Sequence, residues 1–272
     1  MIPTIDYQLI TFSVIDIAQE AATFIREQSG KFKRSDIIIK GLHDMVSYVD
    51  KQSEEMIIKG LKNILPQAGF IAEESGNAIA ETFNWIIDPL DGTTNFVHGI
   101  PLFSISIALK EENSIVSAVV LEVNSRECFY AWKDGPAFCN GLEIKVSTTK
   151  KISQSLIATG FPYSDFSRMI PYMQVFDLLM RESRGIRRLG SAALDLAYVA
   201  CGRFEVFYEY GLHPWDVAAG VLIVERAGGK LSGFDGSDEV IFGKDILASN
   251  GNVHDEMLAI TKECFENKEE TD

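Results

Sequence analysis

Paired cysteines, long apolar runs and an excess of basic residues are all missing from this 272-residue sequence. No stretch of about 18 consecutive apolar residues occurs, and the first six residues lack the basic segment and apolar run of a signal peptide. We therefore expect a cytoplasmic protein with no membrane partner. The four cysteines form no C-x-x-C pair, which argues against a zinc knuckle and a disulfide framework. We expect reduced, mostly buried thiols at Cys128, Cys139, Cys201 and Cys264.

Acidic residues outnumber basic ones. The chain has 25 lysines and arginines against 39 aspartates and glutamates, which gives a formal net charge of −14. Non-specific binding to nucleic acid or to an anionic membrane requires a basic surface, so this balance argues against both partners. A cation is a better match for such a surface.

The composition is that of a folded globular protein, with 46% hydrophobic, 24% charged and 10% aromatic residues. A chain of this length buries on the order of three quarters of its unfolded surface, enough for one large α/β domain or two closely packed halves. Neither a Pro/Ser-rich or Gly/Ser-rich linker nor an internal repeat divides it. We predict a single unit over 1–272, with an N-terminal half at about 1–149 and an α/β half at about 150–265.

The N-terminal half shows two helical patterns followed by short apolar strands. Apolar residues recur at helical spacing over 6–29, and a second helix from about 50 to 65 ends at Pro66. Strands are predicted at 70–72, 85–87, 103–109, 115–123 and 128–132, the last three as consecutive antiparallel strands.

After about Thr149 strands and helices alternate, a pattern typical of an α/β arrangement. The acidic tail over 266–272 is expected to fray. We predict strands at 156–158, 185–188, 204–208 and 246–248, and helices at 172–182, 191–201 and 215–226.

The densest chemical signal is the stretch from Trp85 to Phe96. An apolar strand leads into Asp88 and Asp91, and Pro89 between them prevents a simple helical continuation. If the Leu90 carbonyl turns the same way, three oxygen ligands converge, as Mg²⁺ prefers. Gly92 then enters a helical turn whose backbone N–H groups suit a phosphate. The alternative is structural, with both aspartates capping a helix and Gly92 making a turn.

Other carboxylates lie at element ends and have ordinary structural explanations when taken alone. Glu73 and Glu74 end the strand at 70–72, where neighbouring side chains point to opposite sides, so only one is expected to enter a site. Asp216 precedes an apolar helix, and Asp50 begins one; each alone is typical of a capping residue.

Three separated motifs in this order resemble the inositol monophosphatase family. They are 73–75, 88–96, and Trp215-Asp216 with 218–220. Residues 138–141 and 190–192 match further stretches, and Gly160-Phe161-Pro162 is typical of prokaryotic members. The resemblance covers nearly the whole chain and implies a single layered αβαβα sandwich and a homodimer.

The resemblance also implies a set of metal ligands. Glu73, Asp88 and the Leu90 carbonyl match the ligands of the tightest Mg²⁺. Asp88, Asp91 and Asp216 match those of a second ion, and a third, looser ion would share Glu73. The implied cofactor is therefore two to three Mg²⁺ ions.

Catalytic and substrate roles follow from the same resemblance. Thr93, hydrogen-bonded toward Asp50, matches the residue that orients the attacking water, while Glu73 with its bound metal activates it and Glu74 supports the arrangement. Backbone amides of Gly92 and Thr93 would hold the phosphate. Substrate hydroxyls would meet Ala192, Glu209 and Asp216, and Lys40 matches a lysine near the metals.

The implied activity is a Mg²⁺-dependent phosphomonoesterase, sensitive to lithium, that acts on a small phosphorylated polyol or sugar. Metal-activated water would attack directly, because the sequence offers no obvious nucleophilic Ser, Cys or His arrangement. Inositol monophosphate is the leading substrate.

Two alternative activities within the superfamily remain open, and so does one function of another class. A bisphosphate nucleotidase would carry Gly-Thr-Lys-Glu-Phe after the second aspartate, whereas this chain has Thr94-Asn95-Phe96. Fructose bisphosphatase activity has only the arginines at 184, 187 and 188 in its favour, which otherwise belong to a solvated cluster with Arg181. The other class is a regulatory protein-binding module, which some bacterial relatives exemplify.

Histidines and tyrosines carry weaker signals. The four histidines at 43, 98, 213 and 254 lack metal-ligand spacing, so we expect surface or hydrogen-bonded side chains. Tyr208 and Tyr210, which flank Glu209, are expected to pack within a strand.

Overall fold

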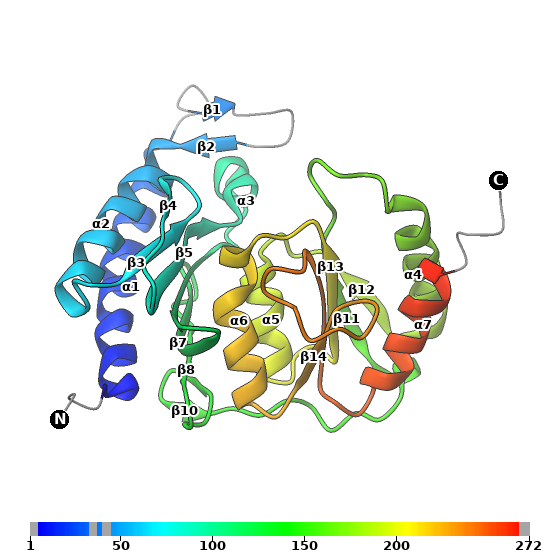
Figure 1. The fold of residues 1–272 in the computed structure, drawn as a ribbon. Helices are drawn as coiled ribbons and strands as arrows, with labels where there is room; N and C mark the ends of the chain where they lie inside the picture. Colours follow the sequence, from blue (N-terminus) through cyan, green and yellow to red (C-terminus); the bar gives the residue numbers. More distant parts are fainter. Residues whose placement is uncertain (1–4, 33–36, 40–44, 267–272) are drawn as a thin grey trace.

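Two long helices form the first layer of the fold. The computed structural model describes residues 5–32, 37–39 and 45–266. Helix α1, Tyr7–Ser29, begins at Asp6, whose side chain accepts the Leu9 N–H and so caps the helix. It packs along helix α2, Tyr48–Ile64, and both turn their apolar faces to the neighbouring sheet (Figure 1).

The second layer is an eight-stranded sheet with the order β10-β9-β8-β7-β6-β5-β3-β4. Only β3 and β5 pair in parallel, and every other neighbouring pair described in this sheet is antiparallel. The strands are β3 Gly69–Ala72, β4 Gly76–Ala78, β5 Phe83–Asp91, β6 Ser104–Glu111, β7 Ser114–Glu122, β8 Cys128–Trp132, β9 Phe138–Cys139 and β10 Leu142–Glu143.

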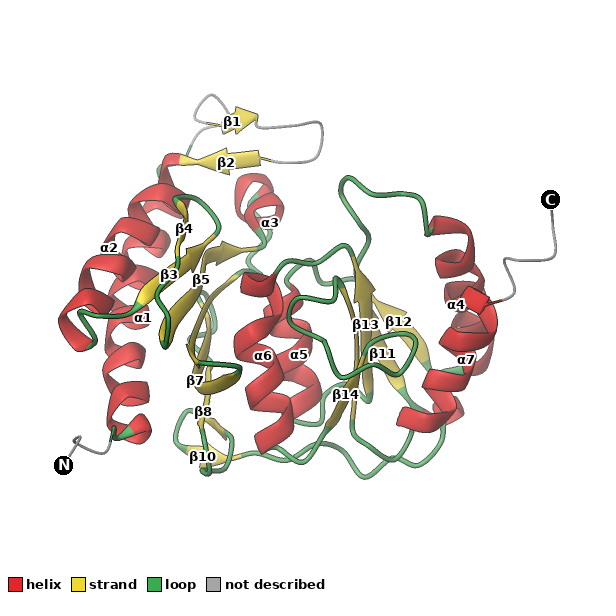
Figure 2. Ribbon diagram, in the orientation of Figure 1, coloured by secondary structure: helices red, strands yellow, loops and turns green. Residues whose placement is uncertain are grey.

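Helices α5, Ala192–Ala200, and α6, Pro214–Arg226, fill the middle layer between the two sheets (Figure 2). Nearly every residue of α5 is buried, as expected for a helix that is apolar apart from Asp195. The pair packs on β6, β7 and β8 on one side and on the second sheet on the other.

The second sheet and its outer helices complete the five layers. Its order is β12-β11-β13-β15-β14, with β11 parallel to both neighbours and β15 antiparallel to both of its own. Helices α4, Met169–Glu182, and α7, His254–Glu266, lie together on its far side (Figure 1). The strands are β11 Leu156–Thr159, β12 Gly185–Arg187, β13 Val206–Tyr210, β14 Lys230–Ser232 and β15 Asp245–Ser249.

The predicted αβαβα layering is confirmed, and so are the helix over 6–29 and the alternation after Thr149. Helix α2 begins two residues earlier than predicted, at Tyr48. Some short elements were not predicted: the two- or three-residue strands β4, β9, β10 and β14, the pair β1 Ile37–Ile39 and β2 Met45–Ser47, and the 3₁₀ helix Ile152–Gln154.

The burial of the cysteines and tyrosines agrees only in part with the sequence-based expectations. Of the four thiols only Cys128 is fully buried, so "mostly buried" was wrong for the three half-buried ones. Tyr208 and Tyr210 do pack in the core of the second sheet, where their rings surround Tyr172. In the part of the chain that the structure describes, no helix is long and apolar enough to span a membrane.

Candidate active site

The parallel pair β3 and β5 places the first two acidic residues side by side. Ala72 is in register with Ile87, and the Glu73 N–H donates to the Ile87 carbonyl at 3.3 Å. The carboxyl ends of parallel strands meet at the same edge of a sheet, so Glu73 and Asp88 become neighbours there. Both line one pocket.

An irregularity at the end of β5 brings Asp91 to the same pocket. Residues three apart in a regular strand point to opposite faces, yet Asp88 and Asp91 both line the cavity. The register with β6 shifts between these two residues, at Pro89 and Leu90. The Leu90 N–H donates to Asp88 Oδ1 at 2.9 Å, which fixes the orientation of that carboxylate.

The chain turns sharply after Asp91. Gly92 has φ +99°, and a Cβ there would come within 3.2 Å of the Gly190 carbonyl oxygen, so the position requires glycine. Helix α3, Thr93–His98, starts directly afterwards. The Thr93 hydroxyl lies 2.9 Å from Asp50 Oδ1 and 3.1 Å from the Leu90 carbonyl oxygen.

Helix α2 supports this region from behind with polar side chains on its buried face. Asp50, only 1% exposed, accepts from Thr93, and the Ser53 hydroxyl donates to the Pro89 carbonyl at 3.4 Å. Glu54, 2% exposed, accepts the Glu74 and Ser75 N–H groups at 2.9 and 2.8 Å. Asp50 is therefore more than the helix cap that its position alone indicates.

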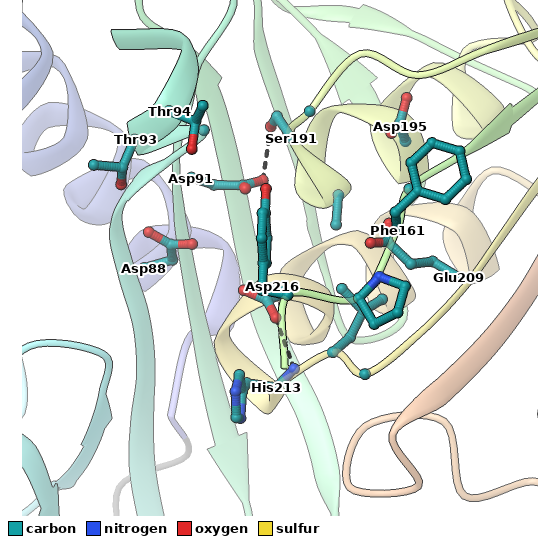
Figure 3. A pocket seen from close by; sticks show the side chains of 18 of the residues that line it. Asp88, Asp91, Thr93, Thr94, Phe161, Ser191, Asp195, Glu209, His213 and Asp216 are labelled. Carbon is teal, nitrogen blue, oxygen red and sulfur yellow. Dashed lines mark hydrogen bonds between the residues drawn. The ribbon is translucent and has the colours of Figure 1, made fainter. Parts of the chain in front are cut away.

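The C-terminal half supplies the opposite wall. Asp216, in the first turn of α6, accepts the His213 N–H through Oδ2 at 2.6 Å, so it caps the helix and also lines the pocket. Asp91 Oδ2 accepts the Ser191 hydroxyl at 2.7 Å and the Ala193 N–H at 2.8 Å, at the start of α5. In Figure 3, Asp88 and Asp91 lie on one side of Asp216, and Glu209 and Asp195 on the other.

The resulting pocket has a volume of about 670 Å³ and extends away from the acidic cluster toward residues of the second sheet. Glu209 packs over Gly160, where a Cβ would meet its carboxylate at 2.1 Å. The Arg188 guanidinium donates to the Tyr163 hydroxyl at 3.0 Å. The pocket is also lined by Phe161, Pro162, Ser164, Phe166, Asp195, Leu212 and Trp215.

The surroundings of the acidic side chains in the site disfavour their ionised forms. Burial raises the pKa of Asp91 to about 6, of Asp216 to about 7 and of Glu209 to about 8. Burial, and then the charge of a neighbouring carboxylate, raises the pKa of both Glu73 and Asp88 well above the usual range. A bound cation would lower these pKa values again, because it favours the ionised form of each group.

The donor set fits a hard divalent metal ion. Glu73 Oε2 is buried and has no hydrogen-bond partner among the described residues, and every other candidate ligand is also an oxygen. Within those residues no three acidic, histidine or cysteine side chains stand together as a complete cage. Mg²⁺ keeps water and phosphate oxygens among its ligands, so it needs only a few oxygens from the protein.

Most residues singled out in the sequence come together here. Asp50 and Glu74 do not line the pocket. Asp50 is connected to it by its hydrogen bond with Thr93, and the backbone of Glu74 follows directly after the pocket residue Glu73. Lys40 lies outside the described residues. The pocket is lined by Glu73, Asp88, Leu90, Asp91, Gly92, Thr93, Ala192, Glu209 and Asp216.

Of the arginine cluster, Arg188 alone lines the pocket, while Arg181 pairs with Asp177 on the surface of α4. His213 is exposed, as expected; its ring stacks on Trp215 at 4.7 Å between ring centroids, and it also lines the pocket. His98 is exposed, His254 lies buried between two serines, and His43 is outside the described residues.

Sequence reasoning missed Glu54 and Asp195. Asp195 lines the pocket, is 1% exposed, and its Oδ1 has no hydrogen-bond partner among the described residues. Glu54 had a detectable signal, because Asp50 and Glu54 fall on the same helical face as Ile57 and Leu61. Acidic residues within an apolar stripe indicate a partner that only the folded chain supplies.

Comparison with known proteins agrees with this geometry. Residues 6–266 match the model of the inositol monophosphatase family. An inositol-1-monophosphatase of Mesorhizobium japonicum is 37% identical over 92% of this chain and 94% of its own, and a Nus factor SuhB of Pseudomonas aeruginosa is 41% identical over 80% and 84%.

Solved structures share the fold. The extragenic suppressor protein suhB from Bartonella henselae superposes with a TM-score of 0.88 at 36% identity, covering 93% of this chain and 98% of its own. An inositol monophosphatase from Anabaena gives 0.84 at 35% identity, covering 94% and 96%.

Proposed function

Because the chain belongs to the inositol monophosphatase family, a family of phosphatases, we propose that it is a Mg²⁺-dependent phosphomonoesterase of small polyol phosphates. Inositol monophosphate is the leading substrate. The observation that carries the proposal is the carboxylate set at one end of the pocket, in which Asp88 is buried and the buried atom Glu73 Oε2 lacks a partner among the described residues. Such a set is stable as charged ligands only beside a cation.

The metal ligands are proposed as the resemblance implies them. Glu73, Asp88 and the Leu90 carbonyl would hold one Mg²⁺, and Asp88, Asp91 and Asp216 a second, with a third sharing Glu73. When bound, these ions lower the pKa of water and neutralise charge on the phosphoryl group. The two sets share Asp88, whose orientation the Leu90 N–H already fixes.

The chain itself positions the water. Asp50 Oδ1 and the Leu90 carbonyl oxygen, which lie beside the Thr93 hydroxyl, only accept hydrogen bonds, so the single hydroxyl proton is directed to their side. The Thr93 oxygen is then left to accept a proton from a water in the pocket, which orients that water for attack. The Gly92 and Thr93 backbone amides are proposed to hold the phosphate.

The part of the pocket away from the proposed metal ions would determine which phosphorylated alcohol binds. Glu209, Ala192 and Asp216 all line the pocket and would contact substrate hydroxyls. Arg188 is the single arginine of its cluster that lines the pocket, so a second phosphate would meet one cation beside the acidic Glu209 and Asp195. This arrangement favours a monophosphate over fructose bisphosphate or a bisphosphate nucleotide.

A substrate panel tests the proposal. Purified protein is assayed for phosphate release from inositol monophosphate, fructose 1,6-bisphosphate, 3′-phosphoadenosine phosphate and glycerol phosphate, with Mg²⁺ and with EDTA. We expect the highest kcat/KM for inositol monophosphate and no turnover in EDTA. Turnover that EDTA leaves unchanged would contradict the metal, and failure on all four compounds would contradict the phosphatase.

A second candidate function comes from relatives named Nus factor SuhB, one of them 41% identical to this chain. We propose that the chain also binds a protein partner. This binding is separable from catalysis if a variant without turnover still binds the partner. Size-exclusion chromatography with light scattering tests the homodimer that the resemblance implies.

A further inference from the structure

Glu54 is a buried carboxylate that neutralises no described lysine or arginine. It lies on the sheet-facing side of α2 and is 2% exposed. Both of its oxygens are used, Oε2 by the Glu74 N–H at 2.9 Å and Oε1 by the Ser75 N–H at 2.8 Å. One side chain thus binds two successive backbone donors of the turn between β3 and β4.

The packing of α2 alone does not require this carboxylate. Burying a charge is unfavourable unless it is hydrogen-bonded, and an apolar side chain would fill the same face without that penalty. Charge-assisted hydrogen bonds to backbone N–H groups are among the strong ones. Glu54 therefore fixes the turn more firmly than a packing residue would.

The turn begins at Glu73, the proposed ligand of the tightest metal ion. Its backbone is held on one side by β5, through the Ile87 carbonyl, and on the other by Glu54 through the next two residues. Its Oε2 atom has no partner among the described residues. The backbone of Glu73 is thus fixed at two points while its carboxylate is left for a ligand.

Asp50 lies one helical turn before Glu54 and accepts the Thr93 hydroxyl. Both segments that face the proposed metals, the turn after β3 and the loop after β5, therefore rest on one face of α2. A rigid helix is a more exact support for ligands than the loops themselves.

We propose that Glu54 is a positioning residue of the metal site: it holds the Glu74 and Ser75 amides so that Glu73 meets the ion without reorganisation. The inference rests on the proposed metal-dependent function. Outer partners of this kind typically contribute roughly 10–100-fold to metal affinity.

The test compares Glu54→Gln with Glu55→Gln. A glutamine keeps one acceptor but turns an NH₂ group toward a backbone N–H, so one of the two hydrogen bonds is lost. Glu55 is the next residue of the same helix, is exposed, and loses the same charge in its variant. The readout is the binding of Mn²⁺ alone to the metal-free full-length protein, followed by the EPR signal of free Mn²⁺.

We expect Glu54→Gln to weaken the tightest Mn²⁺ site at least about tenfold and to raise the Mg²⁺ concentration for half-maximal activity in parallel, while kcat at saturating Mg²⁺ falls less than about threefold. Glu55→Gln should match the wild type in all three. A lowered Tm with Mn²⁺ affinity within about twofold of the wild type would reduce Glu54 to a structural residue and overturn the proposal.

Glu54→Asp covers the case in which the glutamine variant does not fold. It keeps the charge but is one methylene shorter, so it cannot reach both amides, and the same loss of Mn²⁺ affinity is expected; an unchanged affinity overturns the proposal. Failure of the wild type to bind Mn²⁺ has a different meaning, because it would refute the metal-dependent function itself.

Discussion

The Thr93 hydroxyl and the Asp50 carboxylate lie 2.9 Å apart although they are 43 residues apart in the chain. The contact joins the first residue of α3 to the first turn of α2, across the end of β5. Because Asp50 accepts a hydrogen bond from the Thr93 hydroxyl, the oxygen of Thr93 is oriented as an acceptor toward the pocket.

Thr93→Ala should lower kcat about tenfold to a hundredfold with little change in KM, since a group that orients water acts on the transition state. Asp50→Asn should lose a comparable factor. The double variant should be no worse than the poorer single one, because residues that act as a unit are not additive. Steady-state kinetics with inositol monophosphate measures all three.

Thermal melting supplies the control for this set. A threonine that merely caps α3 would contribute about 1 kcal/mol of stability, so its loss would lower Tm and leave kcat largely intact. That purely thermal result in both single variants would remove Thr93 and Asp50 from the mechanism.

Asp88→Asn should nearly abolish turnover, below about a tenth of the wild-type kcat at saturating Mg²⁺, because Asp88 is proposed to contact two ions. The metal-free variant should be at least as stable as the wild type at pH 7. Burial and then the charge of Glu73 raise the pKa of Asp88, so its ionised form destabilises the folded state and a neutral amide does not. Exposed Asp238 provides the matched control, Asp238→Asn, which should leave both properties unchanged.

Arg188→Gln should separate monophosphate from bisphosphate substrates. We expect less than about a threefold loss of kcat/KM for inositol monophosphate, and at least about a tenfold loss of any activity toward fructose 1,6-bisphosphate, in line with one lost hydrogen bond to a charged group. Arg181→Gln, on the surface of α4, is the control. Equal losses on both substrates would mean that Arg188 does not contact a second phosphate.

Lithium should inhibit at millimolar concentration. Li⁺ is close to Mg²⁺ in size but carries half its charge, so it is expected to occupy the second site after hydrolysis and retain phosphate there. Inhibition is measured as kcat against LiCl concentration with NaCl as the ionic-strength control. Activity that is indifferent to lithium would mean that the second site is built differently.

His254 should make the protein less stable in acid. Its ring is buried, with Nδ1 2.9 Å from Ser249 Oγ and Nε2 3.1 Å from Ser232 Oγ, and burial lowers its pKa to about 4. The unfolded chain binds a proton near the reference pKa of about 6.5, so the stability that neutral His254 contributes is lost as the pH falls from there toward 4.

The measurement is the free energy of unfolding against pH for wild type, His254→Gln and the exposed control His98→Gln. The curve of the wild type should fall more steeply than that of His254→Gln between pH 6.5 and 4.5, and His98→Gln should follow the wild type. Parallel curves for all three proteins would contradict the buried neutral histidine.

The sequence predicted the parts of the site that lie within one continuous pattern. The apolar strand before Asp88, the Pro89 interruption and Gly92 are local signals, and the structure has a bulged strand end and a left-handed glycine there. The resemblance added the Thr93 and Asp50 contact, which spacing alone did not reveal. Taken alone, Asp50 and Asp216 had been interpreted as capping residues.

Features that depend on distant neighbours were not predicted. Strands such as β9, Phe138–Cys139, are too short to show an alternating pattern and exist because β8 and β10 pair with them. Asp195 lies in an otherwise apolar helix, and only the packing of α5 against β11 and β13 shows that it lines a pocket. Glu54 likewise has its partners 20 and 21 residues away.

Asp91 joins the two halves of the chain, since its Oδ2 atom holds the Ser191 hydroxyl and the Ala193 N–H at the start of α5. The end of a strand in the first sheet is thereby attached to the helix layer beneath the second. Fragments separated near Thr149 would divide this attachment, with Asp91 in one piece and both donors in the other. Metal ions and substrate would therefore bridge the two fragments. Reassembly of a split protein would then depend on the concentration of these ligands.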